Sequence, residues 1–274
     1  MTFPYKDYLR NEKLPLLWCP GCGDGIVLKA IIRAIHKLGW KKDDIAMVSG
    51  IGCSGRTPGY VDFNTLHTTH GRPVSFATGI KMVRPDKHVI VVSGDGDATA
   101  IGGNHFIHAC RRNIDINLIV INNSIYGMTG GQFSPTTPIG INTSTTPMGN
   151  IDPAFDIGQL AIAAGATFVG RQTVAKGLML SKMMEEGFAH NGMTVIDVIA
   201  NCHTQYGRRN KLGDPIKLIK FLQDKAVPLR KAEKMKPGEL EGKFVTGVLH
   251  KVEREEYTDA YERLIKEAKG QGGE

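Results

Sequence analysis

The sequence predicts an α/β fold in which a mostly parallel sheet has helices on both faces and is followed by a C-terminal extension. Residues 88–93 and 117–121 each contain four consecutive apolar residues (89–92 and 118–121), as expected of parallel strands that are buried on both faces. Between them, residues 101–112 carry apolar side chains at helical spacing, which makes a strand–helix–strand unit. A chain of 274 residues is long enough for one full α/β core with an appendage.

Before this unit, the sequence predicts two helices and one strand. Asp24 can cap a helix over residues 25–37, because apolar residues recur along one face of that segment. A strand at 45–48 follows, and residues 51–72 form a connection rich in glycine, threonine and histidine. A helix over 73–82 then leads into the first strand of the unit.

After the unit, residues 124–150 show almost no periodicity, as expected for a loop that forms part of a site. The elements predicted next are a helix near 156–164, a strand at 166–169, a helix at 173–190 and a strand at 194–199 that completes the sheet.

Beyond Thr204 the composition becomes basic and is punctuated by prolines, and a mostly charged helix over roughly 254–269 ends the chain. We therefore expect a folded domain over 1–205 and a basic extension over 206–274. The extension is either an arm that packs on another subunit or a solvated tail.

The composition argues against several classes of partner. The formal charge of +7 comes from 34 basic and 27 acidic residues, but the excess is too diffuse and too poor in aromatics for a nucleic-acid surface. No apolar run is long enough to cross a membrane, and residues 1–10 are too polar for a secretory leader. We expect a cytoplasmic protein with no nucleic-acid or membrane partner, in which five cysteines serve as metal ligands or reactive thiols.

The motif Gly94-Asp95-Gly96-Asp97 ends one strand of the unit, and Asn122-Asn123 ends the other, 27 and 28 residues after Asp95. Ligands of open α/β sheets bind at the carboxyl ends of the strands. A carboxylate, an amide oxygen and a nearby carbonyl suit a magnesium ion that also holds a diphosphate. Gly94 and Gly96 let the backbone approach phosphates, and the next helix points its N-terminus at them. A generic Gly-Asp turn is the alternative for the motif taken alone.

The cysteines form a second pattern. Cys19-Pro-Gly-Cys22 is a tight loop whose sulfurs can face one point, as in a dithiol or in half of a zinc site, although no apolar strand precedes it as in thioredoxin-like proteins. Cys53 and Cys202 each follow a predicted strand, so all four can meet at one edge of the sheet. Four thiolates would hold either zinc or a 4Fe–4S cluster. Cys110 instead lies on the apolar stripe of the 101–112 helix and is expected in the core.

Together these motifs resemble the beta subunits of 2-oxoacid:ferredoxin oxidoreductases. GDG followed by NN at this spacing is the thiamine diphosphate signature, which implies the thiamine diphosphate-binding fold. CPGCG, GIGCS, GDGD with NN, and a late NC occur in the family's order between residues of about 14 and 205. Residues 126–137 resemble the YGMTGGQ-SPTT stretch of the 2-oxoglutarate branch.

The resemblance assigns these residues to cofactors. Asp95, Asn123 and the backbone carbonyl of Ile125 would bind Mg²⁺. The cysteines that would hold a 4Fe–4S cluster are Cys19, Cys22, Cys53 and Cys202, with zinc as the alternative metal. The residues expected against thiamine diphosphate are Ile51, Gly52, Cys53, Ser54, His70, Gly94, Asp95, Gly96, Asp97, Asn123, Ile125, Gly127 and Met128.

Three side chains near this motif have alternative roles. His70 matches the family's HGR segment, which implies a contact with the cofactor, whereas a lone loop histidine is more often structural. Asp97 can bond the phosphate shell or cap the following helix. Arg72 can pair with a substrate carboxylate or form a salt bridge at a surface or an interface.

The resemblance also implies the reaction. A 2-oxoacid, most consistently 2-oxoglutarate, would be decarboxylated oxidatively with coenzyme A to an acyl-CoA and CO2. Electrons would pass through the 4Fe–4S cluster to ferredoxin, and either direction is open. Rival interpretations are a non-oxidative thiamine diphosphate enzyme subunit with structural zinc and a non-catalytic scaffold that keeps the fold.

The resemblance implies a missing partner as well. Thiamine diphosphate needs an activating glutamate from a second α/β domain, and no such domain fits into the remaining 70 or so residues. No catalytic residue is therefore expected in this chain, and an alpha subunit would supply the glutamate. The complex would be a heterodimer or a dimer of heterodimers, and the chain alone would be inactive.

Overall fold

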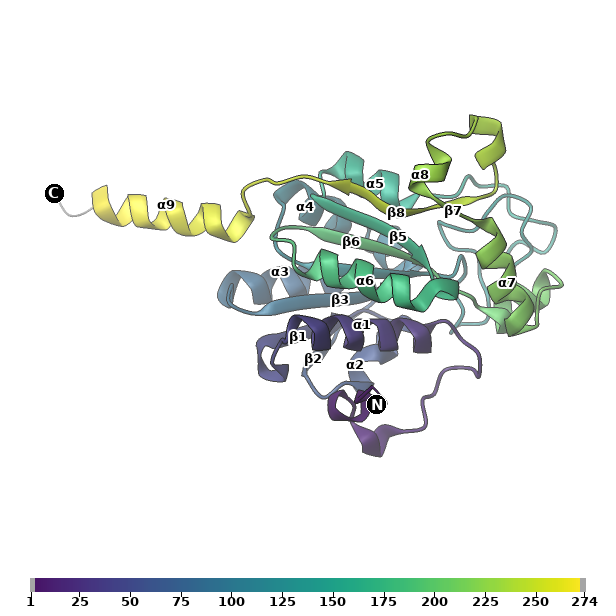
Figure 1. The fold of residues 1–274 in the computed structure, drawn as a ribbon, viewed down its shortest axis with the longest axis horizontal. Coiled ribbons are helices and arrows are strands. Elements are labelled where there is room, and N and C mark those ends of the chain that lie inside the picture. Colours follow the sequence, from purple (N-terminus) through teal and green to yellow (C-terminus); the bar gives the residue numbers. More distant parts are fainter. Residues whose placement is uncertain (1–2, 272–274) are drawn as a thin grey trace.

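The computed structural model describes residues 3–271 of the chain. These residues form an α/β structure around one eight-stranded sheet (Figure 1). The strands are β1 (Ile45–Ser49), β2 (Asn64–His67), β3 (His88–Gly94), β4 (Asn117–Asn122), β5 (Phe168–Thr173), β6 (Thr194–Ile199), β7 (Ala226–Pro228) and β8 (Phe244–Lys251). Their order in space is β2-β1-β3-β4-β6-β5-β8-β7. All neighbours are parallel except β5 and β8, which pair antiparallel. The predicted α/β class with a mostly parallel sheet is confirmed.

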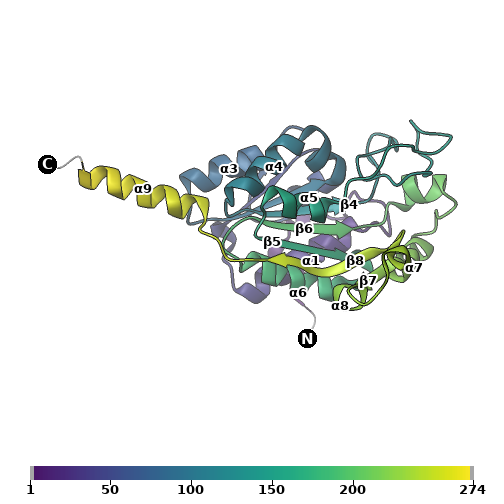
Figure 2. The same ribbon diagram turned by 90° about the horizontal axis from the view of Figure 1, so that it is seen from above.

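Helices cover both faces of the sheet, as predicted (Figure 2). The helices are α1 (Asp24–Leu38), α2 (Thr57–Tyr60), α3 (Pro73–Val83), α4 (Gly103–Arg112), α5 (Ile157–Ala164), α6 (Gly177–Phe188), α7 (Pro215–Lys225), α8 (Leu229–Ala232) and α9 (Tyr257–Gln271). Alternate strand residues serve the two faces. Ile90 and Val92 of β3 pack in the core with α1 and α6, while Val89 and Val91 pack in the core with α3, α4 and α5.

A buried polar network links the strands next to the site. The Arg171 guanidinium on β5 donates to Asp156, which caps α5, and to Asp197 Oδ2 on β6 at 2.7 Å. Asn122 at the end of β4 donates to the other oxygen of Asp197 at 3.1 Å. Burial raises the pKa of Asp197 and works to raise that of Asp156 too, but the bond to Arg171 outweighs it and lowers the pKa of Asp156. This network holds β4, β5, β6 and α5 together.

The connection predicted for residues 51–72 contains more structure than expected. The helix α2 and the edge strand β2 both lie within it. The pattern Asn64–His67 does not alternate between apolar and polar residues, and the strand is largely exposed, so its side chains give no signal of burial. The edge strand β2 pairs with β1 alone.

The prediction that the strand at 194–199 completes the sheet is wrong, because β8 and β7 extend it beyond β5. The β8 segment is mostly half-buried, so its residues do not alternate between apolar and polar as those of a typical strand do. It also contains Gly247 at φ 135° and shifts register against β5 between Val169 and Gly170. The α9 helix then leaves the body of the molecule (Figures 1 and 2). The boundary at residue 205 stays a prediction. No helix within residues 3–271 is long and apolar enough to cross a bilayer.

Candidate active site

Four neighbouring strands deliver the predicted site residues to one edge of the sheet. The carboxyl ends of β1, β3, β4 and β6 lie side by side in the order β1-β3-β4-β6. The segments that follow these strands contain, in turn, Cys53, Asp95, Asn123 and Cys202. The parallel topology therefore brings together residues that are up to 149 positions apart in the sequence.

A first cavity of about 250 Å³ opens at this edge. All of the residues predicted to contact thiamine diphosphate line it: Ile51, Gly52, Cys53, Ser54, His70, Gly94, Asp95, Gly96, Asp97, Asn123, Ile125, Gly127 and Met128. The lining also includes Ile121, which no sequence motif singled out, and Tyr126 and Thr129 from the 126–137 stretch that carries the family resemblance. We call this space the diphosphate cavity.

Asp95 is an almost fully buried carboxylate at the base of the diphosphate cavity, with 2% of its surface exposed. Its Oδ2 accepts hydrogen bonds from Ser134 Oγ at 2.5 Å and from Thr136 Oγ1 at 2.6 Å. Burial raises the pKa of Asp95, although these two hydroxyls favour the charged form. Burying a charged carboxylate costs free energy unless the charge is paired. A buried carboxylate that lines a cavity therefore suits a bound cation.

The turn after β4 places the other two predicted magnesium ligands. Asn123 Oδ1 accepts from the backbone N–H of Ile125 at 3.2 Å, and Ser124 between them adopts a left-handed conformation with φ 59°. Thr137 Oγ1 fixes this turn by donating to the carbonyl of Ser124 at 2.7 Å. Ile125 is 3% exposed and lines the cavity with Asn123. An amide oxygen, a backbone carbonyl and a carboxylate are hard donors that Mg²⁺ accepts.

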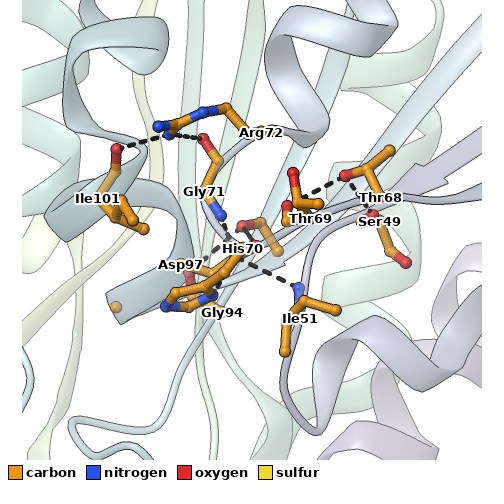
Figure 3. A network of polar contacts seen from close by, with 12 residues as sticks. Ser49, Ile51, Thr68, Thr69, His70, Gly71, Arg72, Gly94, Asp97 and Ile101 are labelled. Atoms are coloured by element: carbon orange, nitrogen blue, oxygen red, sulfur yellow. Dashed lines mark hydrogen bonds and ion pairs between the residues drawn. The ribbon is translucent and has the colours of Figure 1, made fainter.

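Asp97 ties together three segments around the diphosphate cavity (Figure 3). Its Oδ1 accepts from the backbone N–H of Gly71 at 2.7 Å and of Ile51 at 3.3 Å, and its Oδ2 accepts from Ser93 Oγ at 2.5 Å. The side chain is 2% exposed. Both carboxylate oxygens thus bond to the protein, which fits a positioning role for the loop after β1, the 70–72 segment and the end of β3.

His70 and Arg72 flank this network. The Nδ1 atom of His70 lies 2.7 Å from Asp97 Oδ1, and the half-exposed ring reaches the cavity lining. Arg72 Nη1 donates to the backbone carbonyls of Gly71 and Ile101, both at 3.2 Å. These two bonds hold the backbone beside His70, and the pairing of Arg72 with a substrate carboxylate or with a carboxylate at an interface stays a prediction.

Tyr126 leaves no room for a side chain at Gly96, the second glycine of the motif. A Cβ built on Gly96 would lie 2.3 Å from the Tyr126 ring, whose hydroxyl donates to the Gly96 carbonyl at 3.2 Å. Burial first, and then the charges of Asp95 and Asp97, raise the pKa of Tyr126. The sequence signals for this contact are that Tyr126 follows the Asn122-Asn123 pair and begins the 126–137 stretch that carries the family resemblance.

A second cavity, of about 460 Å³, contains all four cysteines that were predicted to share a site. Cys19 is exposed, Cys22 and Cys53 are half-buried, and Cys202 is buried. We call this space the thiol cavity. It shares Cys53, Asn123, Gly127 and Met128 with the diphosphate cavity. A Cβ on Gly127 would meet Cys202 Sγ at 3.4 Å and Cys53 Sγ at 3.8 Å, so a glycine keeps this shared wall thin.

Two hydrogen bonds from side chains to backbone carbonyls fix the cysteine loop against the strand ends. Asn201 Nδ2 donates to the carbonyl of Gly21 at 2.8 Å, which holds the loop beside Cys202. Trp18 Nε1 donates to the carbonyl of Cys53 at 2.8 Å, which holds the loop beside the end of β1. These two bonds bring three separate segments to one cavity.

The thiol cavity disfavours free thiolates. Burial, and then the charge of Asp24, raise the pKa of Cys53 to about 12, and the same two causes raise the pKa of Cys22. Asp24 itself is 1% exposed, and burial raises its pKa to about 6. Thiols in such surroundings stay protonated at neutral pH unless a metal displaces the protons.

Within residues 3–271, no three histidine, cysteine or acidic side chains converge closely enough to hold a single metal ion. The four cysteines instead surround a cavity. A tetrahedral zinc site needs four sulfurs about 2.3 Å from one point, whereas a 4Fe–4S cluster offers a separate iron atom to each cysteine. Cys110 lies apart in the apolar core with 0% exposure, as predicted.

Comparisons with known proteins agree with this geometry. Residues 50–198 match the family model described as "Thiamine pyrophosphate enzyme, C-terminal TPP binding domain"; thiamine pyrophosphate is thiamine diphosphate. The 2-oxoglutarate synthase subunit KorB of Methanocaldococcus jannaschii is 50% identical over 268 residues, which cover 98% of this chain and 99% of that protein. The subunit of the same name from Archaeoglobus fulgidus is 49% identical over 264 residues, covering 96% of this chain and 95% of that protein.

A solved structure is similar over the whole chain. The 2-oxoglutarate:ferredoxin oxidoreductase from Magnetococcus marinus, with 2-oxoglutarate, coenzyme A and succinyl-CoA bound, superposes with a TM-score of 0.87. The sequence identity is 30%, and the match covers 100% of this chain and 93% of that chain.

Proposed function

This chain belongs to the beta subunits of 2-oxoglutarate:ferredoxin oxidoreductases, and on that basis we propose that it holds both thiamine diphosphate and a 4Fe–4S cluster for the oxidative decarboxylation of 2-oxoglutarate. The complete reaction would yield succinyl-CoA and CO2 and would pass electrons to ferredoxin. The observation that carries the proposal is the pair of cavities, which share four lining residues at one edge of the sheet.

The diphosphate cavity fits thiamine diphosphate with Mg²⁺. Asp95, Asn123 and the carbonyl of Ile125 would hold the ion, because the buried carboxylate and its two oxygen-donor neighbours line one cavity. Gly94 and Gly96 line this cavity, and glycines would let the backbone come close to the phosphates. When bound, thiamine diphosphate supplies the electron sink for breaking the bond to the departing carboxylate. The protein's own part is to hold and orient it.

The thiol cavity fits a 4Fe–4S cluster better than zinc. Cys19, Cys22, Cys53 and Cys202 surround the cavity instead of converging on one point. The raised thiol pKa of Cys53 means that binding would require proton release, as expected of a site that is completed by its metal. When bound, the cluster supplies one-electron steps. The shared wall at Cys53 and Gly127 would keep it beside the diphosphate cavity.

A partner subunit would complete the active site. No glutamate of residues 3–271 lines the diphosphate cavity, so the acid that activates the aminopyrimidine ring would come from an alpha subunit. We therefore propose that the chain works as a heterodimer or a dimer of heterodimers. The similar structure contains 2-oxoglutarate, coenzyme A and succinyl-CoA, which supports the same substrates for this complex.

Residues 206–274 would contribute to assembly. The α9 helix stands away from the body, and Tyr261, Leu264 and Ile265 on it are 46%, 57% and 38% exposed. An isolated helix of this length is marginal in water, so a helix with exposed apolar residues suits packing on another subunit.

The test is to copurify the chain with its native alpha subunit without oxygen. The complex should contain thiamine diphosphate, iron and acid-labile sulfide, and should show the broad brown absorbance of the cluster. With coenzyme A and a panel of 2-oxoacids, it should reduce viologen fastest with 2-oxoglutarate. A colourless complex with stoichiometric zinc would instead support the non-oxidative enzyme, and a complex without thiamine diphosphate would support a scaffold.

A further inference from the structure

We propose that Thr204 raises the reduction potential of the 4Fe–4S cluster by donating its hydroxyl hydrogen to a cysteine ligand. This inference rests on the proposed function of the thiol cavity. It goes further by assigning a positioning and tuning role to a side chain that is not itself a ligand.

The geometry around Thr204 singles out this residue. Its Oγ1 lies 3.7 Å from Cys19 Sγ and 3.8 Å from Cys202 Sγ, both within the range of hydrogen bonds to sulfur. Thr204 also lines the thiol cavity. Among the hydrogen bonds of residues 3–271, these two are the only ones that join a hydroxyl to a cysteine sulfur. One hydroxyl thus lies between a ligand from the N-terminal loop and a ligand from the end of β6.

The backbone fixes the position of this hydroxyl. Thr204 lies in a π-helical turn over His203–Gly207 that directly follows Cys202. The turn is closed by the N–H of Gly207, which donates to the Cys202 carbonyl at 2.9 Å. Arg208 Nε donates to the Thr204 carbonyl at 3.0 Å. The β-branched side chain has few χ1 rotamers, and in the observed rotamer the hydroxyl lies beside both sulfurs.

The direction of the hydrogen bond follows from the chemistry of the ligands. A thiolate bound to iron carries no proton, so Thr204 must be the donor, and its one hydrogen serves either Cys19 or Cys202 at a time. Reduction adds an electron and makes the sulfurs more negative. A hydrogen bond to sulfur therefore stabilises the reduced cluster more than the oxidised one and raises its potential.

Two substitutions at Thr204 separate the effect of the hydroxyl on the reduction potential from the effect of the side-chain shape. In the complex with the alpha subunit, Thr204→Val removes the hydroxyl but keeps the branched shape, whereas Thr204→Ser keeps the hydroxyl. We expect both variants to retain wild-type iron, sulfide and thiamine diphosphate. The midpoint potential, measured by redox titration of the visible or EPR signal, should become more negative in Thr204→Val and should stay close to wild type in Thr204→Ser.

Controls and contrary outcomes distinguish this inference from the proposed function. Thr78→Val removes a hydroxyl that bonds only to Val74 within α3 and should leave the potential unchanged. An unshifted potential in a fully loaded Thr204→Val complex would overturn the role of Thr204. If Thr204→Val and Thr204→Ala both lose the cluster while Thr204→Ser keeps it, the hydroxyl serves assembly and the tuning role is wrong. A wild-type complex without iron and sulfide would refute the proposed function itself.

Discussion

At the scale of single residues, Asp95 shows the conflict between folding and function. The carboxylate is 2% exposed, and burial raises its pKa, so keeping it charged costs free energy in the cofactor-free protein. The hydroxyls of Ser134 and Thr136 offset part of this cost. A bound cation would offset the rest, so the residue contributes little to stability until the cofactor is present.

Asp95→Asn should therefore separate binding from stability. We expect the affinity for Mg²⁺ and thiamine diphosphate to fall by about 100-fold or more, because a charged ligand is lost. The cofactor-free variant should unfold at a denaturant concentration no lower than wild type, since a buried charge is removed. Calorimetric titration and urea unfolding measure the two effects. Asp86→Asn, at an exposed position before β3, is the control, and wild-type affinity in Asp95→Asn would refute the assigned role.

The cysteines provide a matched pair of variants. Cys202→Ser should lose the visible absorbance of the cluster, or convert it to another form, while thiamine diphosphate still binds. Cys110→Ser should keep the full absorbance, because Cys110 lies in the core away from the thiol cavity. It should cost about 1 kcal/mol or more of stability, because a polar hydroxyl replaces a buried thiol. Equal iron content in both variants would contradict the assignment of Cys202.

The residues that could be predicted are those whose chemistry is tied to a strand end. Asp95, Asn123, Cys53 and Cys202 follow strands that are rich in apolar residues, so parallel topology alone brings them together. The supporting contacts of Ser134, Thr136 and Tyr126 come from an aperiodic loop. Its path is set by hydrogen bonds that leave no pattern in the sequence, so the partners of Asp95 and Gly96 required the structure.

At the scale of elements, Arg171 couples the packing of the sheet to the site. It bonds to Asp197 on β6 and to Asp156 at the start of α5, while Asn122 joins β4 to the same Asp197. Asn122 directly precedes the proposed magnesium ligand Asn123. A change at β5 can therefore reach the diphosphate cavity through side chains that do not touch it.

Arg171→Met should destabilise the protein by about 3–5 kcal/mol at neutral pH, because the buried carboxylate of Asp197 loses its cation. The pKa of Asp197 in the folded state is already raised by burial and would rise further in the variant. The folded state then binds a proton more tightly than the unfolded chain does. The variant should therefore recover its lost stability most fully below about pH 4. This recovery should disappear as pH rises through the folded-state pKa of Asp197.

Urea unfolding of Arg171→Met and wild type across pH tests this prediction. Arg84→Met, which breaks the exposed pair with Asp86, should change stability by less than about 1 kcal/mol. A destabilisation of Arg171→Met that does not depend on pH would show that packing, and not the charge of Asp197, dominates.

Whether an element was predictable depended on its burial. The strands β1, β3, β4 and β6 and the helices α1, α3 and α4 lie close to the predicted ranges, because buried elements leave a clear apolar period. The strand β5 is buried throughout but runs over 168–173 instead of 166–169, because residues 170–173 are glycine and polar residues that give no apolar signal. The helix α6 runs over 177–188 instead of 173–190. The elements β2, β7 and β8 at the sheet margins were missed, since exposed or half-buried strands have little of this period.

At the scale of the whole molecule, the activity is expected only from the complex. The isolated chain, even when loaded with both cofactors, should show no viologen reduction with 2-oxoglutarate and coenzyme A, because the activating glutamate would come from the proposed alpha subunit. Adding the purified alpha subunit should restore turnover. Full activity of the isolated chain would show that the glutamate is in this chain after all.

The α9 helix should matter for assembly and not for the fold. A chain that ends after Ala260 keeps Glu256, whose carboxylate accepts from the backbone N–H of Asp115 at 2.7 Å, and should melt at the wild-type temperature. Its affinity for the alpha subunit should be weaker, because exposed apolar residues of α9 are lost. Leu264→Ala with Ile265→Ala should weaken association in the same direction, and Lys266→Ala should not. Ultracentrifugation of the mixed subunits measures this, and unchanged association would refute the role of α9.

The direction of β8 has a consequence for the terminal arm. Because β8 runs antiparallel to β5, it ends beside the beginning of β5. The chain therefore leaves the sheet at the edge opposite to the carboxyl ends of the parallel strands, where the two cavities lie. A change in the terminal arm would therefore leave the residues around the two cavities in place. It would act on the reaction only through the association with the alpha subunit.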